Sequence, residues 1–477
     1  MLISLIAKKR SKKADEQLSE QDEVNKKLKQ SVNIDSNVDD SGTTAKNKNN
    51  EITVDPIEIP LDGTFKEILF LSLLLLLLLA IVIGYDINNT IVKALIDDPI
   101  LLTKKLISFR SITPDDGGSL EFISSFVEQL GFQTKVSSTQ GVTNLFARWS
   151  PKSGFKRTLA FNGHVDVVPP GEESLWDSDP FSGDIRNDRI FGRGSVDMKS
   201  SVAAFLIALK EIIEEEELSC SFVLLITSDE EGHAEYGTKE LLKWAVKNNE
   251  SFDHCLVGEP TSSKLVGDTI KIGRRGSLSG SIVCKGKQGH IAYPDKAVNP
   301  VEALILFLNK LKSLKLDEGS DFFEPSSLNI STIDTKNEAL NVIPENSYAN
   351  FNVRFNDQHS CLSLTKKIDS LVTKHNEETN ATLEIKYKCS GESFLTEPGQ
   401  LSDLLTTSIK EIAGVDCKLS TGGGTSDARF VWEYCPVVEF GLVGDTMHQI
   451  NENTKVDDIV LLKNIYKNFL KNYNKKV

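Results

Sequence analysis

Two patterns of apolar residues alternate along the chain from about residue 90 onward. Apolar residues at helical spacing predict amphipathic helices at 119–132 and 199–217. Short apolar stretches within 157–168, 220–232 and 253–260 predict buried strands, each of which runs into a polar turn. Strands that alternate with helices predict an α/β domain, with a mostly parallel sheet covered by helices on both faces.

A middle section, 272–386, has a different pattern. Alternating residues at 276–286 and 347–356 predict antiparallel strands, and apolar residues at helical spacing predict two helices between and after them. We therefore predict an inserted α+β domain at 272–386. It would divide the first domain into two parts, 92–271 and 387–477.

The first 90 residues differ in kind from the rest. Residues 1–66 are rich in Lys, Asn, Asp, Ser and Glu, which predicts a disordered segment. The stretch 68–85 contains no charged residue and is long enough to cross the hydrocarbon core of a bilayer. We therefore predict a single transmembrane helix at 67–86, since the alternative, a buried globular helix, is rarely apolar on every face. Few basic residues flank the span, so its orientation stays open.

Net charge and cysteine content narrow the classes of function. The net charge of −14 argues against binding of a phosphate backbone, so we expect no nucleic-acid partner. The seven cysteines form no Cys-x-x-Cys pair and show no regular spacing, which is typical of reduced thiols rather than of a disulfide framework. Any metal site is then expected to use His, Asp and Glu.

Histidines and acidic residues follow directly after the predicted strands. His164 and Asp166 follow the first, Glu230 and Glu231 the second, and Glu259 the third. The carboxyl ends of neighbouring parallel strands form one edge of a sheet, where ligands bind. We expect these side chains to meet there, although a solvated turn is the simpler interpretation of the Asp-Glu-Glu run taken alone.

Asp197, in a glycine-rich turn, and His448 complete a set of candidate metal ligands. Mixed His and carboxylate ligands suit Zn²⁺, and five of them suit two zinc ions that share one bridging carboxylate. Such cations would offset the repulsion within the Asp-Glu-Glu run. One glutamate would bind a metal while its neighbour takes a proton from water. If His164 binds a metal, Asp166 can accept the other ring N–H.

Nine motifs occur in order along 92–475: GHVDVVPPG, GRGSVDMKS, TSDEEG, GEPTS, GRRGSL, GKQGHIAYP, NVIP, STGGGTSDARF, and EFG followed by HQINE. Together they resemble the succinyl-diaminopimelate desuccinylases, a family in the clan of di-zinc deacylases and peptidases that also holds acetylornithine deacetylases and aminoacylases. The resemblance implies that Asp197 bridges two zinc ions, with cobalt as an alternative in one site. His164 and Glu259 would complete one site, and Glu231 and His448 the other.

The resemblance also implies the catalytic roles and a homodimer. Glu230 would be the general base, and Asp166 would act with it by orienting His164. His290, in the inserted domain, would reach the active site of a partner subunit and stabilise the oxyanion. Tyr293 and Asn341 would contact the substrate in the same way, so the chain would pair through its inserted domain.

The implied reaction removes succinate from N-succinyl-LL-2,6-diaminopimelate, in lysine and peptidoglycan-precursor biosynthesis. The substrate is a small polyanion, and guanidinium groups bind carboxylates through two hydrogen bonds. The expected substrate-binding residues are Arg275, Ser277, Tyr293, Asn341, Arg354, Thr425 and Ser426. A biosynthetic substrate places the catalytic domain in the cytoplasm, tethered to the inner membrane by the predicted span.

Two other functions stay open. A sister deacylase for acetylornithine or another acylated amino acid would use the same metals and base, although GRRGSL with TGGGTSDARF favours the desuccinylase. A non-catalytic, membrane-tethered binding protein is disfavoured because all five ligands and the base are present. Arg274 is either an ion-pair partner or a substrate contact, Asp427 and Arg429 are candidates to pair, and His233 is expected in a surface loop.

Overall fold

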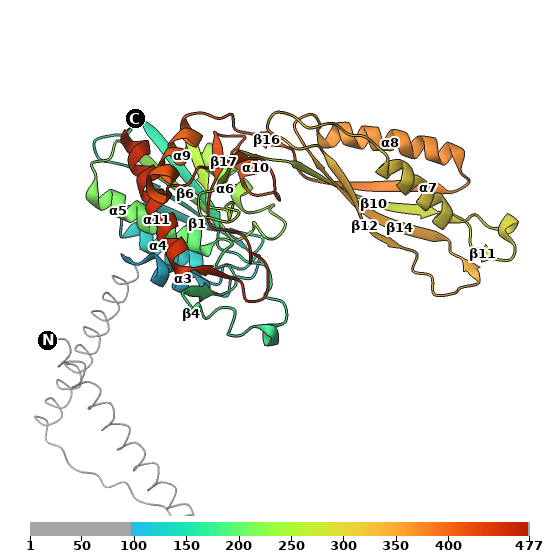
Figure 1. Ribbon diagram of the computed structural model, residues 1–477, viewed down its shortest axis with the longest axis horizontal. Coiled ribbons are helices and arrows are strands. Elements are labelled where there is room, and N and C mark those ends of the chain that lie inside the picture. Colours follow the sequence, from blue (N-terminus) through green and yellow to red (C-terminus); the bar gives the residue numbers. More distant parts are fainter. Residues whose placement is uncertain (1–96, 476–477) are drawn as a thin grey trace, which may run out of the picture. The chain divides into compact units, whose positions relative to one another are not determined.

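An eight-stranded sheet organises the first domain of the computed structural model, which describes residues 97–475 (Figure 1). The strand order is β1-β2-β6-β3-β7-β18-β8-β17. The four strands β6, β3, β7 and β18 run parallel, whereas β2 and β8, on either side of this group, run antiparallel to it. The sheet is therefore mixed, and the expectation of a mostly parallel sheet holds only for its centre. The strands are β1 Gln133–Thr139, β2 Val142–Trp149, β3 Arg157–His164, β6 Cys220–Thr227, β7 His254–Val257, β8 Thr269–Lys271, β17 Lys418–Ser420 and β18 Val437–Glu439.

Helices cover both faces of this sheet because successive strand residues point to opposite sides. In β6, Leu224 and Ile226 pack into one hydrophobic cluster, whereas Val223 and Leu225 pack into another. The first cluster contains residues of α3 Pro99–Ile107, α4 Ser119–Glu128, α5 Lys199–Glu215, α9 Gln400–Ala413 and α11 Val456–Lys475. The second contains residues of α6 Thr238–Lys247 and α10 Ala428–Val431.

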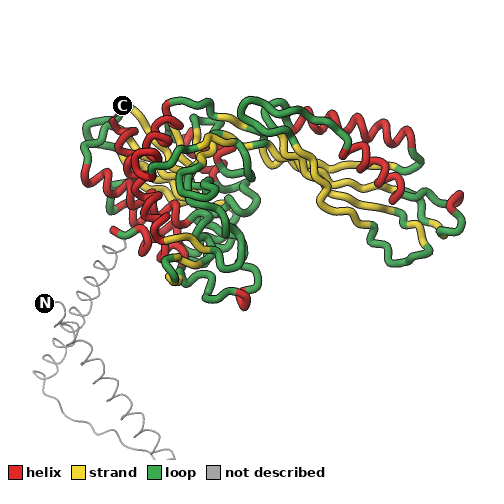
Figure 2. Tube along the Cα trace, viewed as in Figure 1, coloured by secondary structure: helices red, strands yellow, loops and turns green. Residues whose placement is uncertain are grey.

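The inserted domain is a four-stranded antiparallel sheet with two helices (Figure 2). Its strand order is β12-β14-β10-β15, and one hydrophobic cluster joins both helices to the sheet. The elements are β10 Gly276–Lys285, α7 Pro300–Lys312, β12 Ser327–Asp334, β14 Asn346–Phe355, α8 Cys361–Glu378 and β15 Thr382–Gly391. A small ribbon pairs β11 Gly289–His290 with β13 Val342–Ile343, next to the short helix η2 Pro294–Lys296.

The remaining elements form the connection between the two domains and a small separate sheet. Strand β9 Gly273–Arg274 pairs with β16 Phe394–Leu395, where the chain leaves the first domain and returns to it. A three-stranded sheet joins β4 Asp184–Arg186, β5 Arg189–Phe191 and β19 Asn453–Lys455, and the short helix η1 spans Glu173–Leu175. The domain boundaries given above stay predictions, and the segment 1–66 lies outside the described residues.

The predicted transmembrane helix has to be corrected. Within residues 97–475 no helix is both long enough and apolar enough to cross a membrane. The 20-residue α11, for example, carries lysines along one face. The stretch 67–86 itself lies outside the described residues. We therefore withdraw the single span, and with it the anchor through 68–85 and the membrane tether in the expected localisation.

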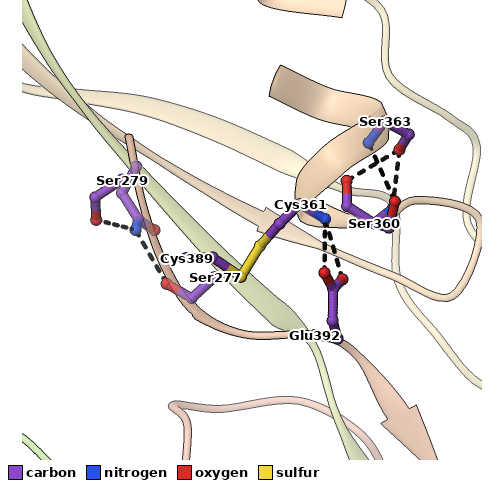
Figure 3. Close-up of a disulfide and its surroundings, with 8 residues drawn as sticks. Ser277, Ser279, Ser360, Cys361, Ser363, Cys389 and Glu392 are labelled. Carbon is purple, nitrogen blue, oxygen red and sulfur yellow. Dashed lines mark hydrogen bonds between the residues drawn. A yellow bond between two sulfur atoms is a disulfide. The ribbon is translucent and has the colours of Figure 1, made fainter. Parts of the chain in front are cut away.

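The prediction that all cysteines are reduced is wrong for one pair. Cys361 and Cys389 form a disulfide between the first residue of α8 and strand β15, with 6.0 Å between their Cα atoms (Figure 3). Next to it, the carboxylate of Glu392 accepts the backbone N–H of Cys361. The two cysteines are 28 residues apart, so only the packing of α8 against β15 brings them together. The other five cysteines are free thiols.

Candidate metal centre and active site

The carboxyl ends of three parallel strands deliver the first group of candidate residues to one edge of the sheet. His164 is the last residue of β3, whose neighbours are β6 and β7. Glu230 and Glu231 follow β6, and Glu259 follows β7. The in-register pairing of β3 with β6 places His164 opposite Thr227, three residues before Glu230. Sheet topology thus brings four of the candidate residues together.

Two triplets of ligand atoms share the carboxylate of Asp197. Its Oδ1 lies 3.1 Å from His164 Nε2, which is also 3.8 Å from Glu259 Oε1. Its Oδ2 lies 3.3 Å from His448 Nε2, which is also 2.8 Å from Glu231 Oε1. Within each triplet the ligand atoms lie within 4.8 Å of one another. The described residues therefore form His, Asp and Glu clusters that can hold metal ions.

The donor set fits two divalent cations rather than one. Asp197 presents a different oxygen to each triplet, which suits a carboxylate shared by two cations. Each triplet supplies one imidazole and two carboxylates, a mixed set that suits Zn²⁺ and leaves a coordination position for water. A further group of potential ligands, Cys361, Cys389 and Glu392, has both sulfurs in the disulfide and so offers no thiolate.

Asp166 supports the site in a different way from the expected one. The nearest acceptor for His164 Nδ1 is the backbone carbonyl of Asp166, at 2.9 Å, whereas the Asp166 carboxylate lies 3.6 Å away. Because a carbonyl only accepts, Nδ1 carries the proton and Nε2 is the atom available to a metal. The carboxylate accepts the backbone N–H groups of Glu230 and Glu231, at 3.3 and 3.0 Å. Burial raises the pKa of Asp166 to about 6, against the opposing effect of His164.

Electrostatics in the cluster favour positive charge. Burial disfavours the charged form of His164, but Asp197 and other carboxylates outweigh this effect and raise its pKa well above the usual value. Hydrogen bonds to Asp197 and Glu231 raise the pKa of His448 to about 10. Burial, and then the charge of Glu259, raises the pKa of Glu230. Divalent cations would supply the positive charge that such crowded carboxylates require.

Comparison with known proteins identifies the family. The model of peptidase family M20/M25/M40 matches residues 160–472. The succinyl-diaminopimelate desuccinylase of Cereibacter sphaeroides is 46% identical over 376 residues, which cover 79% of this chain and 99% of the relative. That of Ehrlichia canis is 46% identical over 381 residues, 79% of this chain and 98% of the relative. The chain belongs to peptidase family M20/M25/M40, and within it to the succinyl-diaminopimelate desuccinylases. The predicted family and the prediction of a hydrolase are confirmed.

Solved structures of M20 peptidases share the fold. The metallo-carboxypeptidase Sso-CP2 of Sulfolobus solfataricus superposes with a TM-score of 0.67 at 20% identity, over 80% of this chain and 100% of its own. The YXEP protein of Bacillus subtilis, a dinuclear metal-binding peptidase, gives a TM-score of 0.61 at 14% identity, over 81% of this chain and 100% of its own. At these identities the likeness concerns the fold alone.

Two expected carboxylate-binding arginines of this desuccinylase-family chain lie close together. Arg275 Nε and Arg354 Nη1 are buried and have no hydrogen-bond partner among the described residues. Burial, and then the charge of Arg275, lowers the pKa of Arg354. Ser277 pairs with Arg354 across β10 and β14, and its hydroxyl accepts a hydrogen bond from Asn352. Two adjacent guanidinium groups with unused N–H donors are suited to an anion.

The loop that carries Thr425 and Ser426 is tied to the sheet through Glu439. Arg274 Nε donates to Glu439 Oε1 at 2.8 Å, and its Nη2 pairs with the other oxygen. Ser426 also donates to Oε1, at 2.9 Å. The open question about Arg274 is thereby answered in favour of a buried ion pair. Thr425 lines a cavity of about 380 Å³ together with Glu230 and Glu231, next to the cluster.

The other candidates from the sequence are Asp427, Arg429 and His233. Asp427 and Arg429 form no ion pair within residues 97–475: Arg429 Nη1 donates to the carbonyl of Ser426, and the carboxylate of Asp427 is buried. His233 is exposed and lies in the loop after β6, where a surface loop was expected. Its backbone N–H bonds to Asp229, whose carboxylate also accepts the N–H groups of Glu235 and Tyr236.

His290, Tyr293 and Asn341 lie together in the small ribbon of the inserted domain. The rings of His290 and Tyr293 have centroids 5.7 Å apart, and the carbonyl of Asn341 accepts the N–H of Ile291 at 3.0 Å. His290 and Tyr293 are exposed. Within residues 97–475 no hydrogen bond or ion pair joins this trio to the metal-ligand cluster.

Proposed function

We propose that this chain hydrolyses the amide bond of N-succinyl-LL-2,6-diaminopimelate, giving succinate and LL-2,6-diaminopimelate. The family supports the substrate, and the carboxylate of Asp197, shared between two ligand triplets, is the observation that supports the chemistry. His164, Asp197 and Glu259 would hold one zinc ion, and Asp197, Glu231 and His448 the other, with cobalt as an alternative in one site. When bound, such ions would polarise the amide carbonyl and lower the pKa of the attacking water.

Glu230 is proposed to move the proton. It takes a proton from the attacking water as the C–O bond forms, and delivers that proton to the amine nitrogen as the C–N bond breaks. The buried carboxylate of Asp166 accepts two backbone N–H groups and so fixes the start of the turn that carries Glu230. Asp229 fixes the rest of that turn, so Glu230 is held in place without a strand or helix of its own.

Arg275 and Arg354 are proposed to bind a carboxylate of the substrate, with Ser277, Thr425 and Ser426 around it. The buried, unpartnered N–H groups of the two arginines support this role. The oxyanion that forms on the amide carbon needs a donor fixed in advance, and His290 is the proposed donor. Because the described contacts leave His290, Tyr293 and Asn341 apart from the cluster, we assign them to the site of a partner subunit.

A homodimer paired through the inserted domain follows from this assignment. Strand β12 is an edge strand of its sheet, and most of its residues are exposed. Apolar side chains on the same domain are exposed as well: Ile305, Leu306, Ile333 and Leu340. An unpaired strand edge beside apolar surface is suited to pairing with a second copy.

The direct test offers purified protein N-succinyl-LL-2,6-diaminopimelate and N-acetylornithine after loading with Zn²⁺. We expect kcat/KM to be higher for the succinyl substrate, and faster turnover of acetylornithine would overturn the substrate assignment. A metal-loaded protein that hydrolyses neither substrate would instead favour a non-catalytic binding protein.

A further inference from the structure

A buried ion pair links the two turns that carry Asp197 and His448. Arg193 Nη1 is 2.8 Å from Glu452 Oε2, and the two side chains are 3% and 0% exposed. Arg193 precedes Asp197 by four residues, and Glu452 follows His448 by four residues. Neither Arg193 nor Glu452 belongs to a group of potential metal ligands.

The Glu452 carboxylate fixes the turn that carries Asp197. Its Oε1 accepts the backbone N–H groups of Val196, at 2.8 Å, and Asp197, at 3.2 Å. Its Oε2 accepts the N–H of Gly194 at 3.2 Å. One buried carboxylate therefore satisfies three donors of a turn that has no strand or helix to order it.

The Arg193 guanidinium fixes two other segments of the site. It donates to the backbone carbonyls of Gln449, at 3.1 Å, and His448, at 3.4 Å. It also donates to the carbonyl of Pro169 at 3.4 Å, in the loop that follows His164. The pair thus contacts the segments of three ligands, His164, Asp197 and His448.

The backbone at His448 needs such support. Its φ is 62°, in the left-handed region that residues other than glycine rarely adopt. A residue in this region keeps its conformation only when surrounding contacts fix it. His164 and Glu259, by contrast, lie at or just beyond the ends of paired strands.

We propose that Arg193 and Glu452 are positioning residues that set the metal affinity of the site formed by Asp197, Glu231 and His448. The proposal rests on the metal centre of the proposed function. Glu452 acts through the Asp197 turn, and Arg193 through the backbone of His448. The other site depends on the ion pair less, because His164 and Glu259 follow directly from strands of the sheet.

The test is a titration of the full chain, stripped of metal, with Zn²⁺ in a calorimeter. Wild type should bind two equivalents, and His448→Ala should identify which of them belongs to the Glu231–His448 site. In Glu452→Gln that same equivalent should bind about 10–100-fold more weakly, as outer-shell substitutions generally do, and the other, which shares only Asp197 with it, should weaken by a smaller factor. In a titration with Co²⁺, the visible absorption spectrum of the variant should differ from that of wild type at the same equivalent.

A matched control removes a carboxylate far from the cluster. Glu211 on α5 pairs with Lys463 and Lys467 of α11, so Glu211→Gln removes the same charge from a surface network. It should leave both metal affinities as in wild type. Wild-type affinity for both equivalents in Glu452→Gln would overturn the positioning role while leaving the proposed function intact. A wild-type chain that binds no metal would overturn both.

A second variant keeps the proposal testable if Glu452→Gln fails to fold. Arg193→Lys keeps the positive charge beside Glu452 but loses the forked contacts to the carbonyls of His448 and Pro169. This variant should weaken binding of the same metal equivalent. Faster amide hydrogen exchange should be confined to the turns around Asp197 and His448. Unchanged metal affinity in Arg193→Lys, or exchange that rises equally across the sheet, would contradict the proposal.

Discussion

Replacing Arg274 by Met should destabilise the protein strongly. Arg274 is the partner of Glu439, whose side chain is 1% exposed, and it contacts both carboxylate oxygens of that residue. Without Arg274, the Glu439 carboxylate stays buried with the hydroxyl of Ser426 as its remaining side-chain donor among these contacts. Removal of one partner of a buried pair costs about 3–5 kcal/mol of the free energy of unfolding. That is a large share of the about 5–15 kcal/mol that stabilises a typical protein.

The measurement is the free energy of unfolding from equilibrium denaturation in urea. The double variant Arg274→Met with Glu439→Gln removes the uncompensated charge, so it should recover more than half of the loss. The kcat/KM of the single variant should also fall, because Arg274 Nη1 holds the carbonyl of Gly424 in the loop before Thr425. A rise in KM without loss of stability would show that Arg274 binds substrate, and the reasoning from the ion pair would be refuted.

Three further predictions concern the substrate site, the inserted sheet and the disulfide. Arg354→Met should raise KM about 10–100-fold with a smaller change in kcat, since a charge-assisted hydrogen bond contributes about 1.5–3 kcal/mol; an unchanged KM would remove Arg354 from the substrate site. Gly280→Ala should cost about 1–3 kcal/mol of unfolding free energy in urea denaturation, because its Cβ would overlap the Phe351 ring; full stability would contradict this packing. Cys361→Ser should lower the stability of the inserted domain by about 3–4 kcal/mol, from the entropy of the closed loop. Reductant should have the same effect on wild-type melting, and a wild type indifferent to reductant would argue against the disulfide.

The candidate metal ligands could be found from the sequence because strand topology places them. His164, Glu230, Glu231 and Glu259 directly follow apolar strands, and the parallel centre of the sheet brings these ends to one edge. His448 could not be placed in this way. It lies in a turn with a left-handed backbone; the residues named it as a candidate ligand, and the resemblance to a family assigned it to one metal site.

Contacts between distant turns could not be predicted from the sequence. Arg193 and Glu452 stand in the quoted GRGSVDMKS and HQINE motifs, yet they meet across 259 residues. The disulfide could not be predicted for the same reason, because nothing in the spacing of Cys361 and Cys389 distinguishes them from the other cysteines. The apolar stretch 68–85 led to a wrong prediction of a transmembrane span, because that prediction used length and hydropathy alone.

The sheet differs from the expected one through its first hairpin. A tight turn at Gln140 and Gly141, both with positive φ, joins β1 to β2. It returns the chain so that β2 pairs antiparallel with β6. Apolar patterning identifies buried strands but carries no information on their direction, so the mixed character of the sheet could not be read from it.

Metal content and turnover should be measured together in Glu230→Gln. We propose that Glu231 binds a cation, whereas its neighbour Glu230 only moves a proton. The amide side chain keeps the size of the glutamate but cannot take up the proton from water. We expect two metal ions per chain, as in wild type, and turnover lower by at least about 10²-fold. Loss of metal from this variant, or turnover near that of wild type, would contradict the claim.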